Sequence, residues 1–412
     1  MFHSRRPAAL RLHPLVACIG LGLLVTSVSR AEDPEPPLGV NVLENTFKWR
    51  PNYVSDDMLM HADKDANNWL HYGKDYQNTR FSALTQITTE NVKKLVPKWN
   101  LSFGVNEAQD SQTTVINGRV FVTASQNKVF ALDGVTGKML WKYERSLPGD
   151  LGPKLCCDAV NRGVALYKDM VFMATLDTHV VALNSTTGAV VWEKKMGDYK
   201  SGEIYTSMPL VAKGMVIVGN SGGDVGGNVG AHHRARTRTN GEVIWETKTR
   251  PTSAEPSPGQ DLGERLVEDG RIIGVADRHL RSRRPTPMLW GVGNPTPDFD
   301  PERAQGRQPV YSNSTLALDA RHRQDQVPLP VHAERLRGTT TATTKSSMVD
   351  DEKGRKVWVH GDRNGHLYSI DRTNGKCNWV VPIARVNWVT GLSARTAGRS
   401  SIRTRCLATT RS

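Results

Sequence analysis

The sequence lacks a long hydrophobic run. Its longest apolar stretch, Leu15 to Val28, is shorter than the roughly 20 residues that a membrane-spanning helix needs. Basic residues precede this stretch and Ser29-Arg30-Ala31 follows it, as in a secretory signal peptide with a small residue at the cleavage position. We therefore expect residues 1–31 to be a signal peptide, the mature chain 32–412 to be periplasmic, and a stable membrane span to be absent.

Cysteines are few. Of the five, Cys18 lies in the signal peptide, and Cys377 and Cys406 have no evident partner in the sequence. The other two, Cys156 and Cys157, are adjacent, and adjacent cysteines form a disulfide only through a strained eight-membered ring. The oxidising periplasm permits such a bond. Two ordinary thiols are an equally acceptable interpretation of the bare pair, so its meaning depends on the surrounding residues.

Acidic residues are too few to balance the basic ones. The chain has 54 Lys and Arg against 41 Asp and Glu, a formal net charge of +13, which could indicate a nucleic-acid partner. However, the arginines are clustered in stretches that have neither helical nor strand periodicity. We therefore exclude nucleic acid as a partner. These stretches are Ala231 to Arg238, Gly274 to Arg284, Glu302 to Arg323, Arg335 to Arg337 and Ala394 to Arg405.

A repeated pattern dominates the rest of the chain. Each copy has an apolar strand, a turn that contains glycine and a second strand that ends in tryptophan. Trp141 to Trp192 is 51 residues and Trp192 to Trp245 is 53, close to the blade period of a β-propeller. We predict an all-β propeller in which each tryptophan packs between neighbouring blades; two stacked hairpins in a sandwich are the alternative. The copies span residues 130–141, 181–192, 239–245 and 369–379.

The residues around the cysteine pair carry a family resemblance. Cys156-Cys157-Asp158, followed by Asn161-Arg162-Gly163, resembles the vicinal-disulfide segment of pyrroloquinoline quinone (PQQ) dependent alcohol dehydrogenases, the quinoprotein methanol and ethanol dehydrogenases. The resemblance implies that a Cys156–Cys157 disulfide lies against one face of PQQ and that Arg162 reaches the reactive oxygens of the quinone. It also implies an eight-bladed propeller in the complete family, of which this chain covers an incomplete part.

Further residues match cofactor contacts of that family. Thr206 corresponds to a threonine that bonds a PQQ carboxylate, and Asp110 corresponds to an acidic residue near the quinone. Arg363, in the turn Asp-Arg-Asn-Gly, corresponds to an arginine that contacts the quinone carbonyls. The resemblance also assigns close approach to the quinone to Ser221, Gly222 and Gly223. Without the resemblance, a solvated threonine, a loop carboxylate, a solvated arginine and a glycine-rich hairpin turn would be the ordinary interpretations.

Two residues match the metal ligands of the family. Asp224 replaces the usual glutamate of the Ser-Gly-x-Glu loop, and Asn294 lies in a Gly-x-Gly-Asn-Pro segment. Carboxylate and carbonyl oxygens suit a hard cation, so the resemblance implies Ca²⁺ or a lanthanide ion. The shorter aspartate reduces the reach of this ligand. The adjacent His232 and His233 are not interpreted as a metal pair.

The resemblance also implies a reaction. In the family the metal polarises the quinone carbonyl, an aspartate takes the alcohol proton, and hydride passes to the quinone, which gives an aldehyde. A small alcohol is the implied substrate and a c-type cytochrome the implied electron acceptor; a homodimer remains open. The alternative is a non-catalytic propeller that acts as a binding scaffold. Such a scaffold has no reason to keep Cys156, Cys157, Arg162, Asp224, Asn294 and Arg363 together.

The family's catalytic aspartate has no counterpart in this reading frame. Codons exist for Gly338 to Ser347 that encode a segment with Asp-Tyr-Asp when the DNA is read two bases along. Codons also exist for Val275 to Arg284 that encode a segment beginning with tryptophan when the DNA is read one base later. A tryptophan expected from the repeat would fall near Val327, which is 52 residues before Trp379. We hypothesise a frameshifted, C-terminally truncated family member that is inactive as translated. We expect disruption near 231–238, 252–289, 302–347 and 394–412, and exposed sheet edges where blades are missing.

Overall fold

The computed structural model describes two long segments and a series of shorter ones. These are residues 52–155, 158–221, 232–236, 241–248, 272–275, 288–292, 314–318, 327–329, 343–362, 365–372, 377–385, 391–396 and 404–409. Helices are short in these residues: α1 (Asp56–Met60) and the 3₁₀ turns η1 (Val92–Lys94), η2 (Gly152–Lys154) and η3 (Tyr199–Ser201). In this part of the chain, no helix has the length and apolar character that crossing a bilayer requires.

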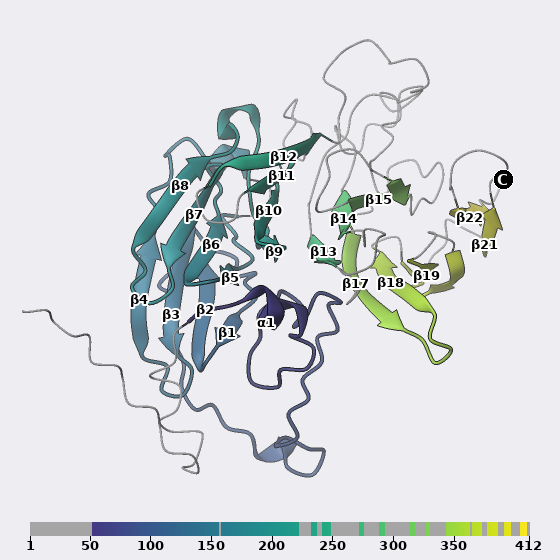
Figure 1. The fold of residues 1–412 in the computed structure, drawn as a ribbon, viewed down its shortest axis with the longest axis horizontal. Helices are drawn as coiled ribbons and strands as arrows, with labels where there is room; N and C mark the ends of the chain where they lie inside the picture. The colour runs from purple at the N-terminus through teal and green to yellow at the C-terminus, as the bar shows by residue number, and fades with distance from the viewer. Residues whose placement is uncertain are drawn as a thin grey trace, which may run out of the picture. The chain divides into compact units, whose positions relative to one another are not determined.

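The strands of the described residues form five four-stranded antiparallel sheets and one two-stranded hairpin (Figure 1). In each four-stranded sheet, strands that are neighbours in the sequence are hydrogen-bonded neighbours. A succession of such sheets is the blade pattern of a β-propeller. The predicted fold class is therefore confirmed, and we number the sheets blade 1 to blade 5 in chain order.

Blade 1 comprises β1 (Thr114–Ile116), β2 (Arg119–Ala124), β3 (Lys128–Asp133) and β4 (Met139–Glu144). Blade 2 comprises β5 (Ala165–Tyr167), β6 (Met170–Ala174), β7 (His179–Asn184) and β8 (Val190–Lys195). Blade 3 comprises β9 (Leu210–Ala212), β10 (Met215–Gly219), β11 (His232–Arg236) and β12 (Val243–Lys248). Blade 4 comprises β13 (Ile272–Val275), β14 (Met288–Val292), β15 (Ser314–Leu318) and β16 (Val327–Leu329). Blade 5 comprises β17 (Thr343–Asp350), β18 (Lys356–Asp362), β19 (His366–Asp371) and β20 (Cys377–Pro382), and β21 (Gly391–Thr396) pairs with β22 (Thr404–Thr409).

The strand register repeats around the tryptophans. In four blades the tryptophan of the outer strand pairs with a residue of the preceding strand, and a β-bulge follows at once. The pairs are Ala131 with Trp141, Ala182 with Trp192, Ala235 with Trp245 and Ser369 with Trp379. In blade 4, Val327 pairs with Ala317. Val327 therefore occupies the register position of the tryptophans, where the repeat period places one.

The turn before each outer strand is stabilised by an Asx-type arrangement. The Oδ1 atom of Asp133 accepts hydrogen bonds from the backbone N–H groups of Val135 at 3.1 Å and Thr136 at 2.8 Å. Asn184 does the same for the corresponding turn of blade 2. Each turn then reaches a glycine with positive φ, +72° at Gly137 and +74° at Gly188, a conformation that favours glycine. These two features explain why each of these turns has an Asp or Asn followed three residues later by Thr-Gly.

Trp141 and Trp192 pack between neighbouring blades, as predicted, whereas Trp379 of blade 5 is 43% exposed. The Trp141 Nε1 atom donates to the Ser185 carbonyl oxygen at 3.1 Å, and a Cβ added to Gly188 would lie 2.7 Å from the Trp141 ring. The Trp192 ring also lies against blade 3, because a Cβ added to Gly241 would lie 3.1 Å from it. The indole rings therefore join blade 1 to blade 2 and blade 2 to blade 3.

Burial is concentrated in the inner strands. All residues of β5, β6, β9 and β10 are buried, whereas most residues of the outer strands β4 and β8 are exposed. The central core cluster contains Phe121, Phe172 and the blade 3 strand residues Val216 and Ile217. Chain segments that lead into the inner strands are consequently held by well-packed structure, and the candidate site lies on these segments.

Two observations bear on the less regular parts of the sequence. The segments in which we expected disruption contain strands, among them β11 and β13; ladder hydrogen bonds use backbone groups, so strands can pair without a periodic side-chain pattern. Cys377 is disulfide-bonded, which corrects the expectation that it has no partner. The cysteine to which Cys377 is bonded lies outside the residues whose side chains are described.

Candidate functional site

The candidate site lies where three blades begin. Gln112, Arg162 and Thr206 precede β1, β5 and β9, the first strands of blades 1, 2 and 3. The backbone N–H of Gln112 donates to the Arg162 carbonyl oxygen at 3.1 Å, and the N–H of Arg162 donates to the Thr206 carbonyl oxygen at 2.9 Å. These two hydrogen bonds bring one residue from each of three consecutive blades to the same place.

Arg162 forms the main charged contact of the site. Its Nε atom lies 2.8 Å from Oδ2 of Asp110, within the range of a charge-assisted hydrogen bond. The Arg162 side chain is 12% exposed, whereas that of Asp110 is 52% exposed. The structure therefore joins two residues that the resemblance assigned to the cofactor, with the guanidinium largely buried and the carboxylate facing solvent.

The segment after the cysteine pair is anchored to blade 1. The Asp158 Oδ2 atom accepts a hydrogen bond from Ala108 N at 3.3 Å, and the Ala159 carbonyl oxygen accepts one from Gln126 N at 2.8 Å. Gly163 has a φ of +128°, and a Cβ at this position would lie 2.7 Å from the Gln112 carbonyl oxygen. A larger residue at position 163 would displace Gln112, and with it the hydrogen bond to Arg162.

Thr206 and Ser221 belong to one corner of blade 3. Ile204 and Ser221 form a reciprocal backbone bridge with both hydrogen bonds at 2.8 Å. Thr206 and Ser221 are both buried. The bridge holds the segment before β9 beside the end of β10, so that two predicted cofactor residues lie on adjacent segments.

The other predicted site residues lie outside the described residues. These are Cys156, Cys157, Gly222, Gly223, Asp224, Asn294 and Arg363. Within the described chain, no group of three or more His, Cys, Asp or Glu residues could hold a metal ion. The predicted cysteine ring and the predicted metal pair therefore stay predictions.

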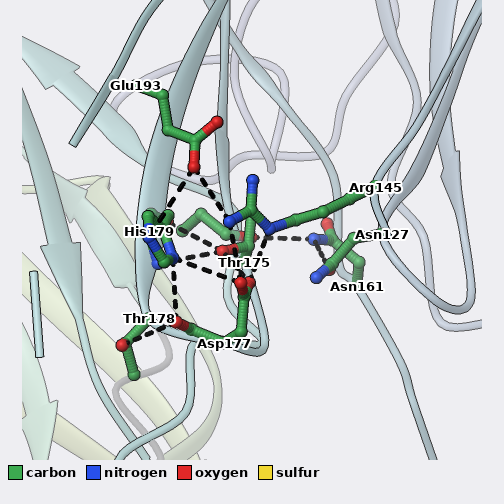
Figure 2. A network of polar contacts seen from close by, with 9 residues as sticks. Asn127, Arg145, Asn161, Thr175, Asp177, Thr178, His179 and Glu193 are labelled. Carbon is green, nitrogen blue, oxygen red and sulfur yellow. Dashed lines mark hydrogen bonds and ion pairs between the residues drawn. The ribbon is translucent and has the colours of Figure 1, made fainter. Parts of the chain in front are cut away.

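A buried ion network near the site was not predicted. Figure 2 shows the guanidinium of Arg145 between Asp177 and Glu193. Its Nε and Nη2 atoms lie 2.6 and 2.7 Å from the two Asp177 oxygens, and Nη2 lies 2.9 Å from Glu193. Arg145 follows β4 of blade 1, whereas Asp177 lies between β6 and β7 of blade 2. The network therefore joins the two blades that also hold Arg162.

Opposing effects determine the charge of this network. Burial alone raises the pKa of Asp177, but hydrogen bonds from Arg145 and Thr175 outweigh burial and hold the pKa below its ordinary value. For Arg145, burial lowers the pKa, and the bonds to Asp177 and Glu193 more than compensate and raise it. Both groups are charged at neutral pH. No local sequence pattern could have indicated the pair, because its members lie 32 residues apart.

Comparison with known proteins gives consistent matches over most of the chain. Residues 69–387 match the family described as "PQQ: Glucose/ethanol/alcohol dehydrogenase, beta-propeller domain". The quinoprotein alcohol dehydrogenase PedH of Pseudomonas putida is 33% identical over 368 residues, 82% of this chain and 59% of that protein. The quinoprotein ethanol dehydrogenase of Pseudomonas aeruginosa is 34% identical over 379 residues, 83% of this chain and 60% of that protein. The chain thus spans about three fifths of these relatives.

Solved structures give the same result. The quinohemoprotein alcohol dehydrogenase from Comamonas testosteroni matches with a TM-score of 0.71 and 27% identity, covering 86% of this chain and 54% of that chain. A europium-containing methanol dehydrogenase matches with a TM-score of 0.68 and 26% identity, covering 82% of this chain and 62% of that chain.

Proposed function

Because the chain belongs to the family of PQQ-dependent quinoprotein alcohol dehydrogenases, we propose that it descends from a periplasmic enzyme that oxidises a primary alcohol to an aldehyde. The observation that carries this proposal is the position of Arg162, whose backbone is bonded to Gln112 and Thr206 and whose guanidinium faces Asp110. We also propose a c-type cytochrome as the electron acceptor of the parent enzyme; a homodimer remains open.

The chemistry of these residues fits PQQ. A guanidinium and two hydroxyl side chains, from Arg162, Thr206 and Ser221, are donors suited to an anionic planar cofactor that carries carboxylate and carbonyl oxygens. When bound, PQQ supplies the quinone that accepts hydride, and the cation supplies Lewis acidity. Arg162 would orient the quinone oxygens, and Thr206 would hold a carboxylate.

The residues outside the described part complete the proposed site. We propose that Cys156 and Cys157 supply a flat surface against the cofactor, and that Gly222 and Gly223 allow close approach. Arg363 would add a second guanidinium. Asp224 and Asn294 would hold Ca²⁺ or a lanthanide ion through oxygen atoms.

The chain as translated differs from the parent enzyme in one respect that decides turnover. No residue in frame corresponds to the aspartate that takes the alcohol proton in the family. We therefore propose that the chain binds PQQ weakly and does not oxidise alcohols. Resequencing the coding DNA from the codon of Gly226 onward tests the frameshift. A corrected frame should encode the Asp-Tyr-Asp segment, whereas a confirmed frame means that the chain is a decayed relative of the enzyme.

Cofactor binding is tested on the full chain. PQQ is titrated in the presence of Ca²⁺ or La³⁺, with quenching of tryptophan fluorescence as the signal. Arg162→Ala should weaken binding at least about tenfold, because it removes the main cationic contact. Arg355→Ala is the control, since Arg355 is an exposed arginine paired with Asp351 in blade 5. Absence of saturable binding by the unmodified chain, or equal affinities for the two variants, would contradict the proposal.

A further inference from the structure

Asn161 is a buried residue whose side-chain amide and backbone carbonyl oxygen are hydrogen-bonded. Its side-chain Nδ2 donates to Asn127 Oδ1 at 3.0 Å and to the Ala174 carbonyl oxygen at 2.9 Å. Its Oδ1 accepts from Gly163 N at 3.1 Å, and its carbonyl oxygen accepts from Thr123 Oγ1 at 2.7 Å. Figure 2 shows the carboxamide of Asn161 beside Asn127. With 2% of its surface exposed, Asn161 depends on protein partners for each of these bonds.

These partners come from two blades. Thr123 lies on β2, and Asn127 lies in the turn between β2 and β3 of blade 1. Ala174 is the last residue of β6 in blade 2. A single side chain therefore bonds the turn of one blade and the strand end of the next, and both contacts are long-range. Asn161 thus fixes the segment before β5 relative to both blades.

The carboxamide oxygen controls the next residue. By accepting from the backbone N–H two positions later, it closes an Asx turn around Arg162. The N–H and carbonyl of Arg162 are held by Thr206 and Gln112. The backbone of Arg162 is thereby fixed on both sides, and the side chain leaves it in one direction, toward Asp110.

We propose that Asn161 is a positioning residue that acts through Arg162 on the cofactor site. This inference rests on the proposed function for the identity of the ligand, but the effect on Arg162 is independent of any ligand. Residues that orient metal ligands typically cost about 10–100-fold in affinity when they are removed, and we expect an effect at the lower end of this range here. Asn161→Ala should therefore release Arg162 and weaken PQQ binding.

Asn52 provides a matched control. It is also a buried asparagine, with 3% of its surface exposed, and its Nδ2 donates over a long range to the Ser185 carbonyl oxygen at 3.0 Å. This hydrogen bond goes to the turn between β7 and β8, not to the segment that carries Arg162. Asn52→Ala should destabilise the fold without changing the site, so it separates a general loss of packing from a loss of positioning.

A second pair of variants avoids the risk that Asn161→Ala fails to fold. Thr123→Val removes the hydroxyl that lies within hydrogen-bond distance of the Asn161 carbonyl oxygen, at 2.7 Å, and of the Ser111 hydroxyl, at 2.8 Å. Thr114→Val is its control, because Thr114 is equally buried in blade 1, and within the described residues its hydroxyl has no hydrogen-bond partner. The two substitutions have the same change of shape, so a difference between them reports the contacts of the Thr123 hydroxyl with Asn161 and Ser111. Ser111→Ala, which keeps the bond between Thr123 and Asn161, separates the two contacts.

The experiment measures Arg162 directly in the full chain. Phenylglyoxal modifies accessible arginines, and peptide mass spectrometry gives the rate at each site. We expect Asn161→Ala to raise the Arg162 rate about tenfold and to weaken PQQ affinity about tenfold. Thr123→Val should change both in the same direction by less, whereas Asn52→Ala and Thr114→Val should leave both unchanged. In an Arg162→Ala background, Asn161→Ala should cost no further affinity.

Arg145 serves as the internal standard, because its side chain is buried to a similar degree and paired with Asp177. A rise at Arg145 equal to that at Arg162 would mean general loosening and would overturn the proposal. Equal Arg162 rates in Asn161→Ala and Asn52→Ala would also overturn it. If the unmodified chain does not bind PQQ, the proposed function fails, and the modification rates still decide whether Asn161 positions Arg162.

Discussion

Trp141 and Gly188 form the contact that joins blade 1 to blade 2. The indole ring fills the space that a side chain at Gly188 would need, and its N–H bonds the carbonyl of Ser185 in the same turn. Trp99 makes the same arrangement with blade 1: its Nε1 lies 3.1 Å from the Gly134 carbonyl oxygen, and its ring lies against Gly137. The blade interface is therefore a repeated pair of one indole and one turn.

Removing this indole should destabilise the protein strongly. Trp141→Ala leaves a cavity between blades and should lower the free energy of unfolding by about 3–5 kcal/mol. Trp141→Phe keeps most of the ring but loses one hydrogen bond, which costs about 1 kcal/mol. Urea unfolding followed by circular dichroism measures both. Trp379→Phe is the control, because this tryptophan of β20 is 43% exposed; an equal loss there would contradict the interface role.

The glycine of the pair can be tested separately. Gly188 and Gly354 have nearly the same φ, +74° and +71°, but a Cβ at Gly354 meets nothing within 4 Å. Gly354→Ala should cost only the backbone strain of about 1–2 kcal/mol. Gly188→Ala adds a clash with the Trp141 ring and should cost about 2 kcal/mol more. Equal losses in urea unfolding would show that the ring yields without cost.

The Arg145–Asp177 pair predicts a loss of stability in acid. Because the pKa of Asp177 is held below its ordinary value, its contribution is present above about pH 4 and is lost as the pH falls through the folded-state pKa. Asp177→Asn should cost about 2–3 kcal/mol at pH 7, since Arg145 loses its paired carboxylate and keeps only the weaker support of Glu193 and Tyr143. It should also flatten the acid limb of the stability profile. The exposed pair of Asp57 and His61 is the control, and Asp57→Asn should change stability little.

The buried His71 predicts a second pH range in which the stability of the fold changes. Burial lowers its pKa to about 4, while the hydrogen bond to the Leu59 carbonyl oxygen and the charge of Asp75 raise it by less. Below pH 6.5 the unfolded chain binds a proton that the folded chain does not, so stability falls by about 3 kcal/mol as the pH drops from 6.5 to 4. In His71→Gln this slope should disappear from urea unfolding measured between these values. His61→Gln, at an exposed histidine, should retain it.

The blade contacts could be predicted because they repeat. Trp141 and Trp192 each follow a Thr-Gly turn at a constant distance, and this periodicity indicates a repeated interface before any coordinates are known. The expectation that each strand ends at its tryptophan is wrong, because β4 and β8 continue three residues further. Trp99 makes the same contact but was missed. It is 42 residues before Trp141, shorter than the other spacings, and no Thr-Gly turn precedes it.

The candidate site was less accessible to sequence reasoning. Asp110 and Arg162 are 52 residues apart, and only the family resemblance linked them before the structure brought them to 2.8 Å. The bond between Asn127 and Asn161 has no periodic signal at all, since both residues lie in irregular segments. Residues that contact a ligand can be transferred by resemblance, whereas residues that position them depend on the three-dimensional packing of two blades.

Each repeat carries its own indole together with the turn that receives the indole of the preceding blade. Blade 2 presents Gly188 to the preceding blade and Trp192 to the following one, only four residues apart. A tandem duplication of such a unit inherits both the donor and the acceptor of the contact, so each new copy can dock on both neighbours without compensating substitutions. This arrangement allows the fold to grow by gene duplication one blade at a time, and it ties the loss of any blade to two broken interfaces.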